Sequence, residues 1–159
     1  MQSLKRLISD SFNRELQETM ATSTSLIHFN LCKKDTSMSS YLNVQHSFKA
    51  IQTKFKLRTG TAGIGEDLAR QHRGSGMCHC GDYESLKHLI FNCRLYSNAR
   101  TRLYLNIRDS YGIHVFNDLL QNPCTFLYRL LGQCDDHFNM HFLSFIDDVW
   151  KIRTHIVPP

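Results

Sequence analysis

Apolar residues recur every three or four positions along most of the chain, and no segment shows sustained alternation with a period of two. The first spacing is typical of amphipathic helices and the second of strands. We therefore predict an all-α, multi-helix protein. The clearest predicted helix begins after Asp135 or Asp136, either of which can cap it. Its apolar face comprises Phe138, Phe142, Phe145, Ile146, Val149 and Ile152.

The same spacing predicts shorter helices over residues 4–16, 41–55, 95–107, 116–120 and 126–131, with one or two turns over 66–72. Gly60 and Gly112 follow two of these segments, and glycine commonly ends a helix in a left-handed conformation. Pro123 ends the 116–120 segment because proline cannot continue a helix. A Thr- and Ser-rich stretch, residues 19–25, interrupts the first helix.

The chain is predicted to have two parts. Residues 1–40 form an N-terminal helical arm and loop, and residues 41–159 form a helical domain. The domain contains a Gly- and Cys-rich segment, residues 76–94, that breaks the helical pattern as a small insertion between helices. A length of 159 residues with 42% hydrophobic composition is sufficient for one buried core.

Hydropathy predicts no membrane partner. The longest wholly apolar runs are three residues, such as 89–91, whereas a bilayer helix needs about 20. The first ten residues also lack the apolar stretch of a signal peptide. We therefore expect a nuclear or cytoplasmic protein whose six cysteines are reduced.

Three of the cysteines are clustered and three are scattered. The scattered ones, Cys32, Cys124 and Cys134, are expected to be small buried hydrophobes. The clustered ones belong to the pattern C-x-C-x7-H-x4-C, which comprises Cys78, Cys80, His88 and Cys93. Zinc takes four such ligands tetrahedrally, and a closed set of four leaves no position for a substrate. We predict a structural zinc ion; the alternative is three unligated thiols and a surface histidine.

The spacing constrains the local fold. Asp82 is expected to cap a short helix over 83–92 that presents His88. On a continuing α-helix, positions 88 and 93 would lie about 140° apart. Cys93 is therefore predicted to lie beyond the helix end, and His79 is expected to be a bystander.

The charge is concentrated around this cluster. The net charge is +5, but residues 44–108 alone carry 11 Lys and Arg against 4 Asp and Glu. Such a concentration of positive charge favours binding of a polyanion such as a nucleic acid, because neutralising its phosphates releases counterions. The alternative is that these side chains form ordinary solvated helix surface and bind nothing. Tyr83, Tyr96 or Tyr104 can stack on unpaired bases. The predicted nucleic-acid contacts are Arg58, Arg70, Arg73, Lys87, Arg94, Arg100 and Arg102.

Residues 57–100 resemble the C-terminal tail of non-LTR retrotransposon reverse transcriptases. The resemblance rests on an L-R-T-G run at residues 57–60, a C-x-C-G run at 78–81, Glu84, an H-L-I-F-x-C run at 88–93, and Tyr96 with Arg100. Arg94 stands where the family commonly has proline. The resemblance implies a zinc-knuckle-like element, with Cys78, Cys80, His88 and Cys93 as ligands, that helps handle an RNA template or DNA target.

Two functions follow as hypotheses. The first is a non-catalytic, zinc-stabilised module that binds RNA or single-stranded DNA. The second is a zinc-stapled helical interaction domain for a polymerase portion that this chain lacks, or a degenerate retroelement fragment without independent activity. No small-molecule substrate is expected, and we predict that the protein is not an enzyme. An F-x-D-D box at residues 145–148 lies on a helical stripe rather than in a strand hairpin, and no deaminase signature is present.

Overall fold

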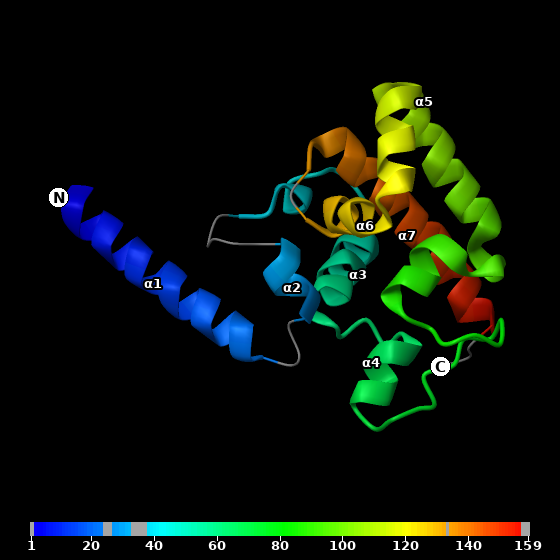
Figure 1. The fold of residues 1–159 in the computed structure, drawn as a ribbon, viewed down its shortest axis with the longest axis horizontal. Helices are drawn as coiled ribbons and strands as arrows, with labels where there is room; N and C mark the ends of the chain where they lie inside the picture. The colour runs from blue at the N-terminus through cyan, green and yellow to red at the C-terminus, as the bar shows by residue number, and fades with distance from the viewer. Residues whose placement is uncertain (1, 24–26, 33–37, 133, 157–159) are drawn as a thin grey trace.

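The computed structural model describes residues 2–23, 27–32, 38–132 and 134–156. In these ranges all regular structure is helical apart from one isolated bridge between Met77 and Tyr83, so the predicted all-α class is confirmed (Figure 1). Single helical turns lie at Ser40–Leu42, His88–Asn92 and Arg94–Tyr96. The α-helices are α1 (Gln2–Thr22), α2 (Ile27–Cys32), α3 (Phe48–Thr59), α4 (Gly65–Arg70), α5 (Ser97–Gln121), α6 (Pro123–Leu131) and α7 (Asp136–Ile156).

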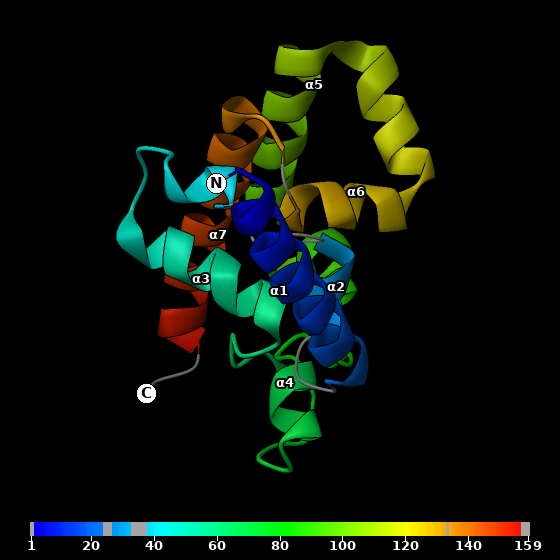
Figure 2. The same ribbon diagram turned by 90° about the vertical axis from the view of Figure 1, so that its left-hand side faces the viewer.

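Helix α7 is the centre of the packing. It contacts α3, α5 and α6, and Figure 2 shows it behind α3 and beside α5. The apolar face predicted for it is buried from Phe138 to Val149, and Ile152 is partly buried against the core. The carboxylate of Asp135 accepts a hydrogen bond from the Phe138 backbone N–H at 3.0 Å, which confirms the predicted N-terminal cap.

The N-terminal helix lies apart from this core. Helix α1 extends away from the other helices and contacts α2, whereas α2 packs on α3 and α6 (Figure 1). Leu7, Ile8 and Phe12 of α1 are exposed. The predicted boundary at residue 40 stays a prediction, but α2, inside the predicted arm, belongs to the packed part of the molecule.

Several predicted boundaries differ from the structure. Helix α3 begins only at Phe48, because the Ser47 hydroxyl caps it by accepting from the Ala50 backbone N–H at 3.1 Å. It ends at Gly60 in the left-handed conformation, as predicted. The two helices predicted over 95–107 and 116–120 share the label α5, but Gly112 separates them with non-helical dihedral angles (φ 82°, ψ 161°), so the predicted break at Gly112 is confirmed. Pro123 begins α6 as well as ending α5, since proline is tolerated in a first turn.

Two cations of α3 are buried in the core. Lys54 and Arg58 both have 0% exposed surface. The Lys54 ammonium donates to the Asn139 side-chain oxygen at 2.6 Å and lies 4.8 Å from the Tyr41 ring centroid. The Arg58 guanidinium lies 5.2 Å from the same ring and donates to the Ser39 hydroxyl at 3.1 Å. Arg58 is therefore buried rather than on the surface, which contradicts the prediction that it contacts phosphates.

The buried Lys54 gives a testable pH dependence. Burial lowers the pKa of Lys54 from 10.5 to about 8. Between these pH values the unfolded chain holds a proton that the folded protein lacks, so the site's contribution to stability increases as the pH rises. We expect the free energy of unfolding of the wild type to increase, relative to that of Lys54→Met, by up to about 3 kcal/mol across this window. Urea unfolding at several pH values measures this; parallel curves for the two proteins would contradict it.

Candidate metal centre

The structure brings the four predicted ligands together. The side-chain ligand atoms of Cys78, Cys80, His88 and Cys93 all lie within 4.8 Å of one another, and all four residues are buried. The Cys78 and Cys93 sulfurs are 3.6 Å apart, and the Cys80 sulfur lies 3.2 Å from Nε2 of His88. His79 is exposed and lies outside this cluster, as expected.

These distances fit a tetrahedral ion. Two sulfurs that each lie ~2.3 Å from a tetrahedral zinc are about 3.8 Å apart, and a sulfur and an imidazole nitrogen are about 3.6 Å apart. The observed sulfur–sulfur distance of 3.6 Å and sulfur–nitrogen distance of 3.2 Å are close to these values. Small side-chain movements therefore suffice to enclose an ion. Three thiolates and one imidazole are a donor set typical of structural zinc sites.

The first two cysteines lie in a tight turn closed by backbone hydrogen bonds. The Cys78 N–H donates to the Asp82 carbonyl at 2.7 Å, and the Gly81 N–H donates to the Cys78 carbonyl at 2.9 Å. Gly81 has a φ of 103°, a conformation that favours glycine because it has no Cβ. This turn directs both sulfurs towards one centre, as the C-x-C pattern predicts.

The other two ligands are joined by a π-turn, which sequence analysis did not predict. The Cys93 N–H donates to the His88 carbonyl at 2.8 Å, an i→i+5 hydrogen bond. This wider turn brings residue 93 back above residue 88, whereas α-helical spacing would place the two apart. Cys93 itself is extended and lies beyond the turn, as predicted.

Asp82 has a different role from the predicted one. The helix predicted over 83–92 is shorter in the structure: it covers residues 86–92, mostly as a π-turn, and the Ser85 hydroxyl rather than Asp82 accepts from the His88 backbone N–H at 3.1 Å. The Asp82 carboxylate instead lies 4.0 Å from Nδ1 of His88. A carboxylate near the non-ligating nitrogen orients a metal-binding imidazole, so Nε2, which faces Cys80, is the nitrogen positioned to bind a metal ion.

Two arginines contact the ligand loops. Nη2 of Arg94 donates to the Cys80 carbonyl at 2.9 Å, and Nη1 of Arg100 donates to the Cys93 carbonyl at 3.1 Å. Burial raises the pKa values of the Cys78 and Cys93 thiols, so both are protonated at neutral pH until a metal displaces the protons. Three thiolates on a divalent ion carry a net negative charge, which the two guanidinium groups partly compensate.

A buried ion pair outside the predicted site connects the insertion with α7. The Arg153 guanidinium is hydrogen-bonded to the Glu84 carboxylate, whose second oxygen accepts from the Gly65 backbone N–H at 2.6 Å. The same guanidinium donates to the Gly63 carbonyl at 3.3 Å. Sequence analysis used Glu84 only for the family resemblance and did not single out Arg153, because the two residues are 69 positions apart and no local spacing relates them.

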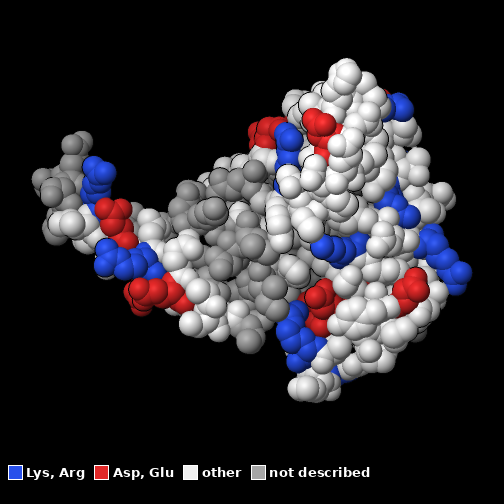
Figure 3. Space-filling view, in the orientation of Figure 1, with Lys and Arg blue, Asp and Glu red and all other residues white. Residues whose placement is uncertain are grey.

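The other basic residues predicted as nucleic-acid contacts differ in whether a carboxylate pairs with them. Arg70 is paired with Asp67 at 2.6 Å, and Arg102 is paired with Asp148 at 2.7 Å. Arg73 and Lys87 are exposed and have no carboxylate partner among the described residues. Figure 3 shows Lys and Arg interspersed with Asp and Glu on this face rather than gathered in one broad patch.

The structure also places the candidate stacking tyrosines, the scattered cysteines and the F-x-D-D residues. Tyr83 is exposed and Tyr104 is half-buried, but Tyr96 is buried and does not present its ring for stacking. Cys32 is buried as expected and Cys134 is partly buried, whereas Cys124 is exposed and the prediction for it is wrong. The F-x-D-D residues are on α7, where Asp147 accepts from the Ser47 hydroxyl at 2.9 Å.

Comparisons with protein families, curated proteins and solved structures found no match. The fold and the site define an all-helical protein with a buried Cys3His cluster that can hold a metal ion. None of the described helices is long and apolar enough to span a bilayer.

Proposed function

We infer that this protein is a zinc-stabilised helical module that binds RNA or single-stranded DNA beside its metal centre. The observation that carries the metal assignment is the convergence of three sulfurs and one imidazole nitrogen within 4.8 Å. Because all four positions of a tetrahedral ion are then filled, the zinc has a structural role. In that role it holds the residue 76–94 insertion in place between α4 and α5.

The nucleic-acid part of the proposal rests on charge near the centre. Lys87 precedes the ligand His88, Arg94 follows the ligand Cys93, and Arg100 contacts the Cys93 carbonyl. The resemblance of residues 57–100 to retrotransposon reverse transcriptase tails also supports this proposal. The metal fixes the backbone from which these side chains project, so loss of the metal would disperse them.

Salt dependence tests the proposal directly. The logarithm of the affinity for single strands falls against the logarithm of salt with a slope of about −0.7 for each phosphate neutralised. We expect Arg73→Gln and Lys87→Gln each to make this slope shallower by about 0.7. Lys151→Gln, an exposed cation on α7, is the control and should leave the slope unchanged. Fluorescence anisotropy with a labelled oligonucleotide at several salt concentrations gives the slopes.

The second candidate function is a zinc-stapled interaction domain. It is favoured by α1, whose Leu7, Ile8 and Phe12 side chains are each more than 60% exposed. Exposed apolar residues on one helix are typical of a surface that packs on another protein. Absent or salt-independent binding of oligonucleotides would favour this function over the first.

A further inference from the structure

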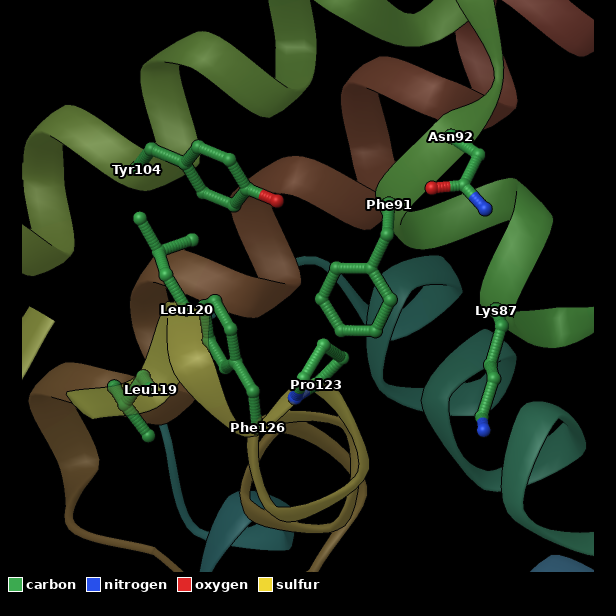
Figure 4. A pocket seen from close by; sticks show the side chains of 8 residues that line it. All are labelled: Lys87, Phe91, Asn92, Tyr104, Leu119, Leu120, Pro123 and Phe126. Atoms are coloured by element: carbon green, nitrogen blue, oxygen red, sulfur yellow. The ribbon is translucent and has the colours of Figure 1, made fainter. Parts of the chain in front are cut away.

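A pocket adjoins the metal centre. Its volume is 310 Å³, at the lower end of the range of about 300–1,000 Å³ for ligand sites. Phe91 lies on the π-turn between the ligands His88 and Cys93, so one wall of the pocket belongs to the metal-binding segment. The opposite wall is formed by Tyr104 and Leu120, which lie on the two halves of the bent helix α5 (Figure 4).

The lining consists of three aromatic rings and three aliphatic side chains, with polar groups at the edge. Phe126, which is 1% exposed, lies at the base, while the partly exposed rings of Tyr104 and Phe91 face the space from two sides (Figure 4). The Asn92 amide and the Lys87 ammonium are at the edge of the pocket. Within the described chain, the Asn92 side chain and the Tyr104 hydroxyl make no hydrogen bond, so both are available to a ligand.

The charge at the opening is positive. Lys87 is exposed, and its ammonium is 3.2 Å from the Cys124 sulfur rather than beside a carboxylate. Among the described residues that line the pocket there is no Asp or Glu. The site therefore combines an apolar pocket with two partly exposed aromatic rings, an amide with both a donor and an acceptor, and the Lys87 ammonium at the opening.

We propose that this pocket receives one unpaired nucleobase of the bound single strand. The base stacks against Tyr104 and Phe91, the Asn92 amide contacts its edge, and Lys87 contacts the adjoining phosphate. An aliphatic side chain of a protein partner would use the apolar lining but leave the amide and the ammonium unused. This inference rests on the proposed nucleic-acid function and names the place where the strand is held.

Two exposed leucines of α5 provide a matched pair for the test. Leu120 lines the pocket and is 40% exposed, whereas Leu105 lies outside it and is 41% exposed. Leu120→Trp fills the pocket, and Leu105→Trp adds the same side chain elsewhere on the same helix. Zinc content and circular dichroism of each variant show whether the fold is retained.

The experiment compares a short thymidine oligonucleotide with an abasic strand of the same length, using the full zinc-loaded chain. We expect the wild type to bind the abasic strand about tenfold more weakly, because base–aromatic stacking contributes on this scale. Leu120→Trp should bind the thymidine strand about tenfold more weakly than the wild type does. Its affinity for the abasic strand should equal that of the wild type. Leu105→Trp should behave as the wild type does.

The outcomes separate the two proposals. Salt-dependent binding of both strands with equal affinity would overturn the nucleobase pocket and leave the proposed function intact. Failure of the wild type to bind either strand would overturn the proposed function itself. The wild-type comparison of the two strands needs no variant, so it decides the matter even if Leu120→Trp does not fold.

Discussion

Replacing Cys80 with Ser, or His88 with Ala, is expected to abolish zinc binding and to unfold the insertion between α4 and α5. Each change removes one of four ligands whose atoms lie within 4.8 Å. The apparent binding free energy of a structural zinc is on the order of 10 kcal/mol, comparable with the whole stability of a domain, about 5–15 kcal/mol. Metal analysis after purification without chelator, together with far-ultraviolet circular dichroism, measures both losses.

Cys124→Ser is the matched control for these ligand variants. Cys124 is an exposed free cysteine outside the cluster, so its replacement should leave zinc content and helicity unchanged. His79→Ala is the corresponding histidine control, since His79 lies within the same turn but outside the cluster. Full zinc retention in Cys80→Ser or His88→Ala would show that the ligand set is misassigned.

The second large effect is expected at the ion pair that connects the insertion with α7. In this pair the Glu84 and Arg153 side chains are only 6% and 15% exposed. Arg153→Met leaves the Glu84 carboxylate buried without its partner, which destabilises a protein by about 3–5 kcal/mol. We expect a loss of this size in the free energy of unfolding measured with urea. Lys151→Met, an exposed change on the same helix, should alter it by less than about 0.5 kcal/mol.

A double variant separates the ion pair from general packing. Glu84→Gln keeps an acceptor for the Gly65 backbone N–H but removes the negative charge. Combined with Arg153→Met, it should recover part of the stability, because no unpaired buried charge remains. Strictly additive losses would indicate that the two side chains act independently.

The Cys3His cluster was predictable because its pattern is local. All four residues lie within 16 positions, and the spacing alone identified them and placed Cys93 beyond a helical turn. The π-turn was not predictable from periodicity, since the apolar residues 89–91 fit an α-helix equally well. It is a compact geometry that returns residue 93 to the same side as residue 88.

Contacts between distant parts of the sequence, and the shortness of one helix, account for what the sequence did not predict. Charge alone indicated that Arg58 is exposed, but the Tyr41 ring and the Ser39 hydroxyl enclose it on the buried face of α3. Arg102, predicted as a nucleic-acid contact, is exposed but paired with Asp148, 46 positions away, which local charge could not reveal; its predicted role stays a prediction. Helix α2 was missed because six residues are too few for a periodic pattern.

The central claim is that Cys78, Cys80, His88 and Cys93 bind one common ion. X-ray absorption spectroscopy at the zinc edge of the purified protein tests it most directly. We predict one equivalent of zinc with three sulfur neighbours at ~2.3 Å and one nitrogen neighbour at ~2.0 Å. A first shell of oxygen and nitrogen only, or a protein that retains no zinc, would contradict the account.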